Sequence, residues 1–119
     1  MESKIIRLYT GPDGESHIGE MSVNFLESHS GKARQWALMK ATGVAVRESD
    51  GPYEYPRHNA PRRQFVITVQ GEWEIEMGDG TKQALKPGDI LLAEDTTGRG
   101  HISRSTADGL RQVIIVTLD

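Results

Sequence analysis

A strict alternation of apolar and acidic residues runs from Glu72 to Met77. A period of two places the apolar residues on one face and the glutamates on the other, which predicts a β-strand with one face in the core and one in water. Before Gly71 lies Phe65–Gln70, rich in the β-branched residues that strands favour. The two segments are therefore predicted to be a pair of strands.

Turn-forming residues divide the rest of the chain into similarly short segments. Gly78–Asp79–Gly80 predicts a hairpin turn, because glycine and aspartate tolerate the positive φ of tight turns. A second turn is expected at Lys86–Asp89. No helical periodicity persists, so we predict an all-β chain of eight to ten strands in a sandwich or barrel. The remaining candidate strands are Lys4–Tyr9, Met21–Leu26, Gln35–Lys40, Gly43–Glu48, Ile90–Ala93 and Arg111–Leu118.

Composition narrows the class of protein. With 119 residues, the chain is expected to form one domain, residues 1–119. A net charge of −3 gives no support for nucleic acid or an anionic membrane as a partner. No segment has the apolar length of a membrane span or the pattern of a signal peptide. Zero cysteines exclude disulfides and thiolate zinc sites, and we expect a cytoplasmic protein.

Residues 58–71 read HNAPRRQFVITVQG, and their spacing resembles the first metal-binding motif of the cupin family, G-x5-H-x-H-x(3–4)-E-x6-G. His58 occupies the first histidine position, and Ala60 stands in place of the second. Gln64 takes the place of the glutamate, with Gly71 at the expected distance after it. From His58 onward the spacing of the motif is kept, whereas two of its ligands are replaced.

A second segment, residues 88–101, reads GDILLAEDTTGRGH and resembles the second cupin motif, G-x5-P-x-G-x2-H-x3-N. Glu94 stands in place of the proline and Thr96 in place of the glycine. Arg99 occupies the expected histidine position, and a histidine follows two residues later as His101. The resemblance extends over residues 51 to about 105, just under half of the chain.

The resemblance implies a cupin-type jelly-roll β-barrel of two antiparallel sheets. Small cupin barrels commonly pair through sheet faces, so it also implies a homodimer. Phe65, Ile67 and Val69 are apolar candidates for the outward face, alongside Trp36 and Trp73, whose facing the sequence leaves open.

The resemblance further implies a divalent first-row metal, such as Fe, Zn or Ni, on His58, Gln64 and His101. Two imidazoles fall short of the three protein ligands that such sites usually provide, and an amide oxygen is a poor substitute for a carboxylate. Glu94 or Asp95 in the following loop could supply the missing carboxylate. Strand parity supports the grouping, because Gln64 shares a face with His58 if the segment between them is extended.

Two function hypotheses follow, and a third is weaker. In the first, the pocket binds a small anionic ligand without a metal, through His58, Arg62, Gln64, Arg99 and His101, because guanidinium groups capture carboxylates or phosphates bidentately. In the second, a metal-dependent enzyme of the oxygenase or isomerase type uses His58 and His101. The third is an oligomerising module with a vestigial pocket. Whether the protein is an enzyme, and which ligand it takes, stays open at the level of the sequence.

Overall fold

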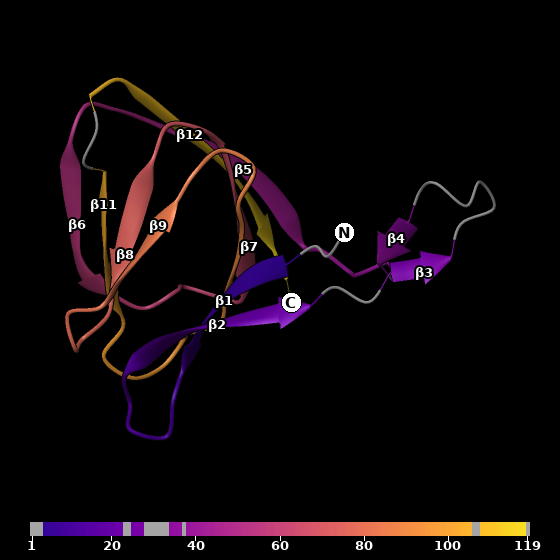
Figure 1. The fold of residues 1–119 in the computed structure, drawn as a ribbon, viewed down its shortest axis with the longest axis horizontal. Helices are drawn as coiled ribbons and strands as arrows, with labels where there is room; N and C mark the ends of the chain where they lie inside the picture. Colours follow the sequence, from indigo (N-terminus) through magenta and orange to yellow (C-terminus); the bar gives the residue numbers. More distant parts are fainter. Residues whose placement is uncertain (1–3, 23–24, 28–33, 37, 106–107, 119) are drawn as a thin grey trace.

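The computed structural model of the protein describes residues 4–22, 25–27, 34–36, 38–105 and 108–118. Within these residues, the secondary structure consists of strands and turns, without helices, as the turn punctuation predicted. No helix of the described chain is therefore long and apolar enough to cross a membrane. Two larger sheets and one separate hairpin make up the fold (Figure 1).

The larger sheet has six strands in the order β2-β1-β10-β7-β12-β5. Its strands are β1 (Lys4–Thr10), β2 (Ser16–Ser22), β5 (Gly43–Asp50), β7 (Gln64–Gln70), β10 (Ile90–Ala93) and β12 (Leu110–Thr117). β1 and β10 run parallel, with Arg7 opposite Leu92, while the other neighbours are antiparallel. The expectation of two antiparallel sheets is therefore corrected for this sheet, which is mixed because the N-terminal hairpin joins it through β1 beside β10.

The second sheet has four antiparallel strands in the order β6-β11-β8-β9. Its strands are β6 (Tyr53–His58), β8 (Trp73–Glu76), β9 (Lys82–Leu85) and β11 (His101–Ser105). No hydrogen-bonded strand pair among the described residues joins the two larger sheets, so they form a jelly-roll sandwich rather than a closed barrel. β3 (Phe25–Glu27) and β4 (Arg34–Trp36) form a hairpin that lies apart from both (Figure 1).

The core fills the space between the two larger sheets. The alternation from Glu72 to Met77 behaves as predicted, with Trp73, Ile75 and Met77 buried and the glutamates at least partly exposed. The larger sheet supplies the opposite half of this core through Leu8, Val66, Leu91, Val113 and Ile115. A smaller cluster around Ile5, Leu92 and Leu118 packs on the outer face of that sheet.

Several predicted strands match the structure, and others differ in extent. Ile90–Ala93 is β10, and the segments predicted at Phe65–Gln70 and Arg111–Leu118 match β7 and β12 within one residue. The single strand expected over Met21–Leu26 is instead the end of β2 and the start of β3. β12 is an interior strand, and the residues on its outer face are only partly buried.

Gly100 holds the entrance to β11 beside β6. It has φ +78°, and a Cβ atom added there would collide with the backbone carbonyl of His58. Gly80, in the predicted hairpin turn, has a similar φ of +87° but no atom within 4 Å of an added Cβ. A substitution at Gly80 therefore bears only the energetic cost of the positive φ. A substitution at Gly100 bears this cost together with that of the collision with the β6 backbone.

We predict that Gly100→Ala destabilises the fold substantially more than Gly80→Ala. The turn variant bears only the conformational cost of a left-handed alanine, about 1–2 kcal/mol, whereas Gly100→Ala must also move the β6 backbone. Urea unfolding followed by tryptophan fluorescence gives the two free energies of unfolding. Equal values for the two variants would contradict this account of Gly100.

Candidate functional site

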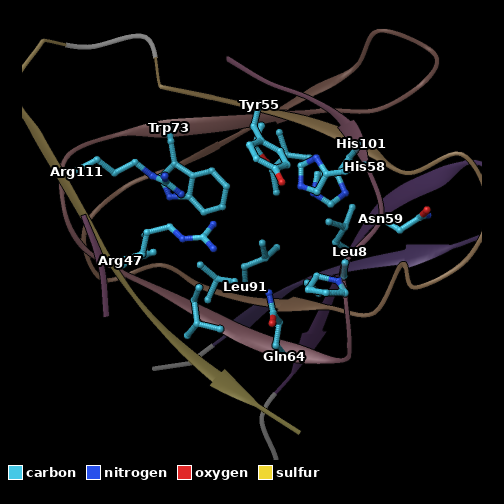
Figure 2. A pocket seen from close by; sticks show the side chains of 18 of the residues that line it. Leu8, Arg47, Tyr55, His58, Asn59, Gln64, Trp73, Leu91, His101 and Arg111 are labelled. Atoms are coloured by element: carbon cyan, nitrogen blue, oxygen red, sulfur yellow. The ribbon is translucent and has the colours of Figure 1, made fainter. Parts of the chain in front are cut away.

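A cavity of ≈ 480 Å³ lies between the two larger sheets and opens to the surface. Its walls are largely apolar, and polar side chains enter from both sheets (Figure 2). The polar and aromatic lining residues are Arg47, Ser49, Tyr53, Tyr55, His58, Asn59, Gln64, Trp73, His101, Ser103 and Arg111. This volume falls within the range of small-molecule sites.

The two motif histidines meet at one end of this cavity. His58 ends β6 and His101 begins β11, and the two residues are directly paired across these antiparallel strands. Their ring centroids are 4.4 Å apart, and Tyr55 packs edge-on against His58 at 4.3 Å. His101 lines the cavity although it lies two residues beyond the histidine position of the motif.

His101 belongs to a buried hydrogen-bond network. Its Nδ1 lies 2.5 Å from Oδ2 of Asp95, and the same oxygen accepts a hydrogen bond of 2.7 Å from the hydroxyl of Ser16. Asp95 is fully buried and His101 is 5% exposed. Because a carboxylate accepts, Nδ1 of His101 carries the proton and Nε2 is the nitrogen available to the cavity.

His58 is held in the same tautomer by a different partner. Its Nδ1 donates to the backbone carbonyl of Pro56 at 2.7 Å, since a carbonyl can only accept. Desolvation by burial lowers the pKa of His58 below its ordinary value, outweighing the opposite effect of the Pro56 hydrogen bond. His58 is therefore a neutral imidazole at pH 7.

Two arginines occupy the other end of the cavity (Figure 2). Arg111 of β12 is 6% exposed; its guanidinium carbon stacks 4.2 Å from the centre of the Trp73 ring and its Nη1 donates to the Tyr53 hydroxyl. Burial, the dominant effect, lowers the pKa of Arg111, and its Nε has no hydrogen-bond partner. Arg47 of β5 reaches the same space.

Neither arginine has a carboxylate partner within the part of the chain that the structure describes. An arginine keeps its charge under all ordinary conditions. This end of the cavity is therefore positively charged, and no carboxylate of the described residues neutralises it.

The structure brings together three of the five residues proposed from the sequence. His58, Gln64 and His101 line the cavity, whereas Arg62 is exposed and is not part of the lining. Arg99 is also exposed, and its guanidinium donates to Glu15 at 2.8 Å. Strand parity fails at Arg62 because β6 ends at His58 and β7 begins only at Gln64.

Arg47 and Arg111 were not among the residues proposed from the sequence. Arg111 alternates with Val113 and Ile115 on the inward face of β12, so parity along that strand could have placed it in the interior. Arg47 pairs with Val113 across β5 and β12, which puts it on the same face. No signal in the sequence alone fixes that pairing.

The donor atoms in the cavity do not fit the metal site that the motif resemblance implies. Two imidazoles and the amide of Gln64 provide no anionic ligand. Glu94 is occupied by Arg7 and Arg63, with contacts of 2.6 and 2.5 Å, and Asp95 lies behind the imidazole of His101 on its Nδ1 side. Among the described residues, no group of three or more His, Asp or Glu side chains could hold an ion.

No family model and no curated protein matches the chain. Among solved structures, it is similar to a conserved protein of unknown function from Streptococcus pyogenes, with 17% identity over 71% of this chain and 70% of the other and a TM-score of 0.50. The Cnp3 cupin domain of Schizosaccharomyces pombe matches at 14% identity over 100% and 83% of the two chains, with a TM-score of 0.49. A sugar phosphate isomerase from Silicibacter pomeroyi, described as from a cupin superfamily, matches at 16% identity over 99% of this chain and 71% of the other, with a TM-score of 0.46.

At these sequence identities, the similarity concerns the fold alone, and no function can be transferred to this chain from these proteins. The two-sheet architecture and the pairing of His58 with His101 agree with the resemblance found in the two motifs. The fold of the chain is therefore a jelly-roll sandwich of two sheets.

Proposed function

We propose that the cavity binds a small organic anion through Arg47 and Arg111. The observation that carries this proposal is the state of Arg111: a guanidinium that is 6% exposed, with an unsatisfied Nε and no carboxylate partner among the described residues. A buried charge without a counter-charge is costly, and an anionic ligand would offset that cost. Arg47 and Arg111 take the roles that the sequence suggested for Arg62 and Arg99.

The remaining lining limits the chemistry of the ligand. A carboxylate or phosphate can accept two parallel hydrogen bonds from one guanidinium, which supplies geometry as well as charge. Leu8, Val66 and Leu91 give the cavity an apolar wall that suits a carbon skeleton. Gln64 and the two histidines offer polar contacts away from the arginines (Figure 2). A small carboxylic or phosphorylated molecule with an apolar body meets these conditions.

The metal-dependent alternative, an oxygenase or isomerase using His58 and His101, would require a third protein ligand. Gln64 is neutral, and both nearby acidic side chains are engaged elsewhere. Two arginines in the same cavity would also repel a dication. The donor set and the local charge therefore favour the anion over the metal.

We also propose that the protein is a homodimer formed through the outer face of the larger sheet. On this face, Val46, Ile114 and Ile67 form one cross-strand row, and Val44, Val116 and Phe65 form another. Val44 is 70% exposed and Val46 is 62% exposed. Trp73 is excluded as a contact because it lies in the core, and the side chain of Trp36 lies outside the described part of the chain.

The separate β3–β4 hairpin supports the same interpretation. It forms its own two-stranded sheet and lies apart from the two larger ones (Figure 1). An isolated two-stranded hairpin is only marginally stable in water. A second copy of the chain would cover the exposed valines and give the hairpin a surface to pack on.

We expect Arg47→Ala to weaken the binding of small anions by about 10- to 100-fold, because a charge-assisted hydrogen bond contributes roughly 1.5–3 kcal/mol. Isothermal titration with pyruvate, malonate and inorganic phosphate measures this loss. Arg62→Ala is the matched control, since Arg62 belongs to the first motif but lies outside the cavity. Equal weakening by both variants would contradict the assignment to Arg47.

We expect protein purified without a histidine tag to retain little Fe, Zn or Ni after incubation with each metal and dialysis, because the cavity lacks an anionic ligand. Elemental analysis should give the same low content for wild type and His58→Ala. Near-stoichiometric metal that disappears in both His58→Ala and His101→Ala would transfer the assignment to the metal-dependent enzyme.

We expect light scattering at micromolar concentration to give about twice the chain mass of 13.2 kDa. The double variant Val44→Lys/Val46→Lys should shift the mass toward the monomer, because it places charge on the proposed contact. Ala84→Lys, on an exposed position of β9 in the other sheet, is the matched control. A wild-type mass near 13 kDa would rule out the dimer.

A further inference from the structure

The buried Asp95–His101 pair has the geometry of an acid–base dyad directed at the cavity. Asp95 accepts the Nδ1 proton of His101, which fixes the ring and leaves Nε2 as the basic nitrogen. His101 lines the cavity, and nothing in the described part of the chain hydrogen-bonds its Nε2. Ser16 holds the carboxylate in place from β2. A purely structural histidine would normally have both nitrogens satisfied.

The dyad has no nucleophile of the protein to activate. The chain contains no cysteine. Ser49 and Ser103 line the cavity, but neither hydroxyl is hydrogen-bonded to His101 in the described structure. A proton taken up by Nε2 therefore comes from the bound molecule or from water.

The two ends of the cavity carry different chemical groups. The dyad lies at one end, and Arg47 and Arg111 lie at the other (Figure 2). An anionic group held by the arginines would leave the rest of a small molecule directed toward His101. The ring of His58, tilted against that of His101 with 4.4 Å between the ring centres, is neutral and does not oppose the positive charge that His101 gains when it is protonated.

We propose that this cavity catalyses proton transfer at a carbon next to a ketone carbonyl. The substrate would be a small molecule that carries this ketone together with a carboxylate or a phosphate ester. His101 is the general base and Asp95 is its positioning residue. The proposal rests on the proposed function, because it requires the arginines to hold the anionic end of the substrate. A C–H bond next to a carbonyl is the weakly acidic bond that such a molecule can offer to an imidazole.

The step is balanced within the protein and one substrate. The C–H bond breaks as Nε2 of His101 takes the proton, and the electron pair forms a carbon–carbon double bond. The carbonyl π electrons move to oxygen, where the guanidinium groups offset the negative charge. Asp95 offsets the charge of the imidazolium without itself taking the proton. Return of a proton to the same carbon completes an exchange. Where that carbon also carries a hydroxyl group, the proton can instead return to the former carbonyl carbon while the hydroxyl proton passes to the former carbonyl oxygen, which completes an isomerisation without oxidant or reductant.

The test is solvent hydrogen exchange in D2O, followed by proton nuclear magnetic resonance. The probes are pyruvate, 2-oxobutyrate and dihydroxyacetone phosphate, each with a parallel calorimetric titration. We expect at least one bound probe to lose its proton signal next to the carbonyl faster with protein than in buffer. His101→Gln should reduce the exchange rate by at least about 100-fold, the usual lower bound for a general base, while the probe still binds.

Asp95→Asn tests the positioning role, since it should lower the exchange rate and leave the dissociation constant of the probe unchanged. The matched control is His17→Gln, which removes another histidine paired with an aspartate, 2.9 Å from Asp13 and outside the cavity lining. It should exchange like the wild type. Circular dichroism melting shows which variants are folded, and an unfolded His101→Gln would leave Asp95→Asn to decide the role of the dyad.

The outcomes separate this inference from the proposed function. Binding with exchange that depends on His101 and Asp95 supports both. Binding without exchange above the buffer rate, or exchange that persists in folded His101→Gln and Asp95→Asn, overturns the proton-transfer activity and leaves the anion site standing. Absence of binding by all three probes overturns both.

Discussion

The buried carboxylate of Asp95 is the interaction on which the cavity wall depends. Its side chain binds Ser16 of β2 and His101 of β11, and its backbone carbonyl accepts the amide of Ala60 in the link between β6 and β7. One residue thus connects three segments that are far apart in the sequence. A buried carboxylate can be kept only if its partners remain in place, so this residue fixes the loop from β10 to β11 and the orientation of His101 together.

Much of the architecture followed from local chemistry that the sequence displays directly. The alternation at Trp73 and Ile75 requires a half-buried strand, and the Gly78–Asp79–Gly80 turn is closed by the hydrogen bond from the amide of Gly80 to the carbonyl of Met77. The parallel pairing of β1 with β10 was not predictable in this way. It depends on a long-range arrangement of hairpins, which no run of residues encodes locally.

The candidate site was predictable in part for the same reason. His58, Gln64 and His101 sit in motifs with recognisable spacing, and all three line the cavity. The arginines were misplaced because parity was extended through a non-strand segment at Arg62 and because Arg99 lies in a loop that folds back onto Glu15. Arg111 instead lies within a β-branched run whose apolar character conceals it. Its inward position is visible only when the alternation of that strand is followed residue by residue.

β5 is an edge strand whose two faces have different neighbours, and this has a consequence for cooperativity. Arg47 faces the cavity, while Val46 and Val44 face outward on the same short strand. A ligand that fixes Arg47 and a second chain that covers the valines would favour the same ordered position of β5. The two equilibria are then linked, and linkage is reciprocal: whatever factor the ligand adds to self-association, self-association adds to the affinity for the ligand.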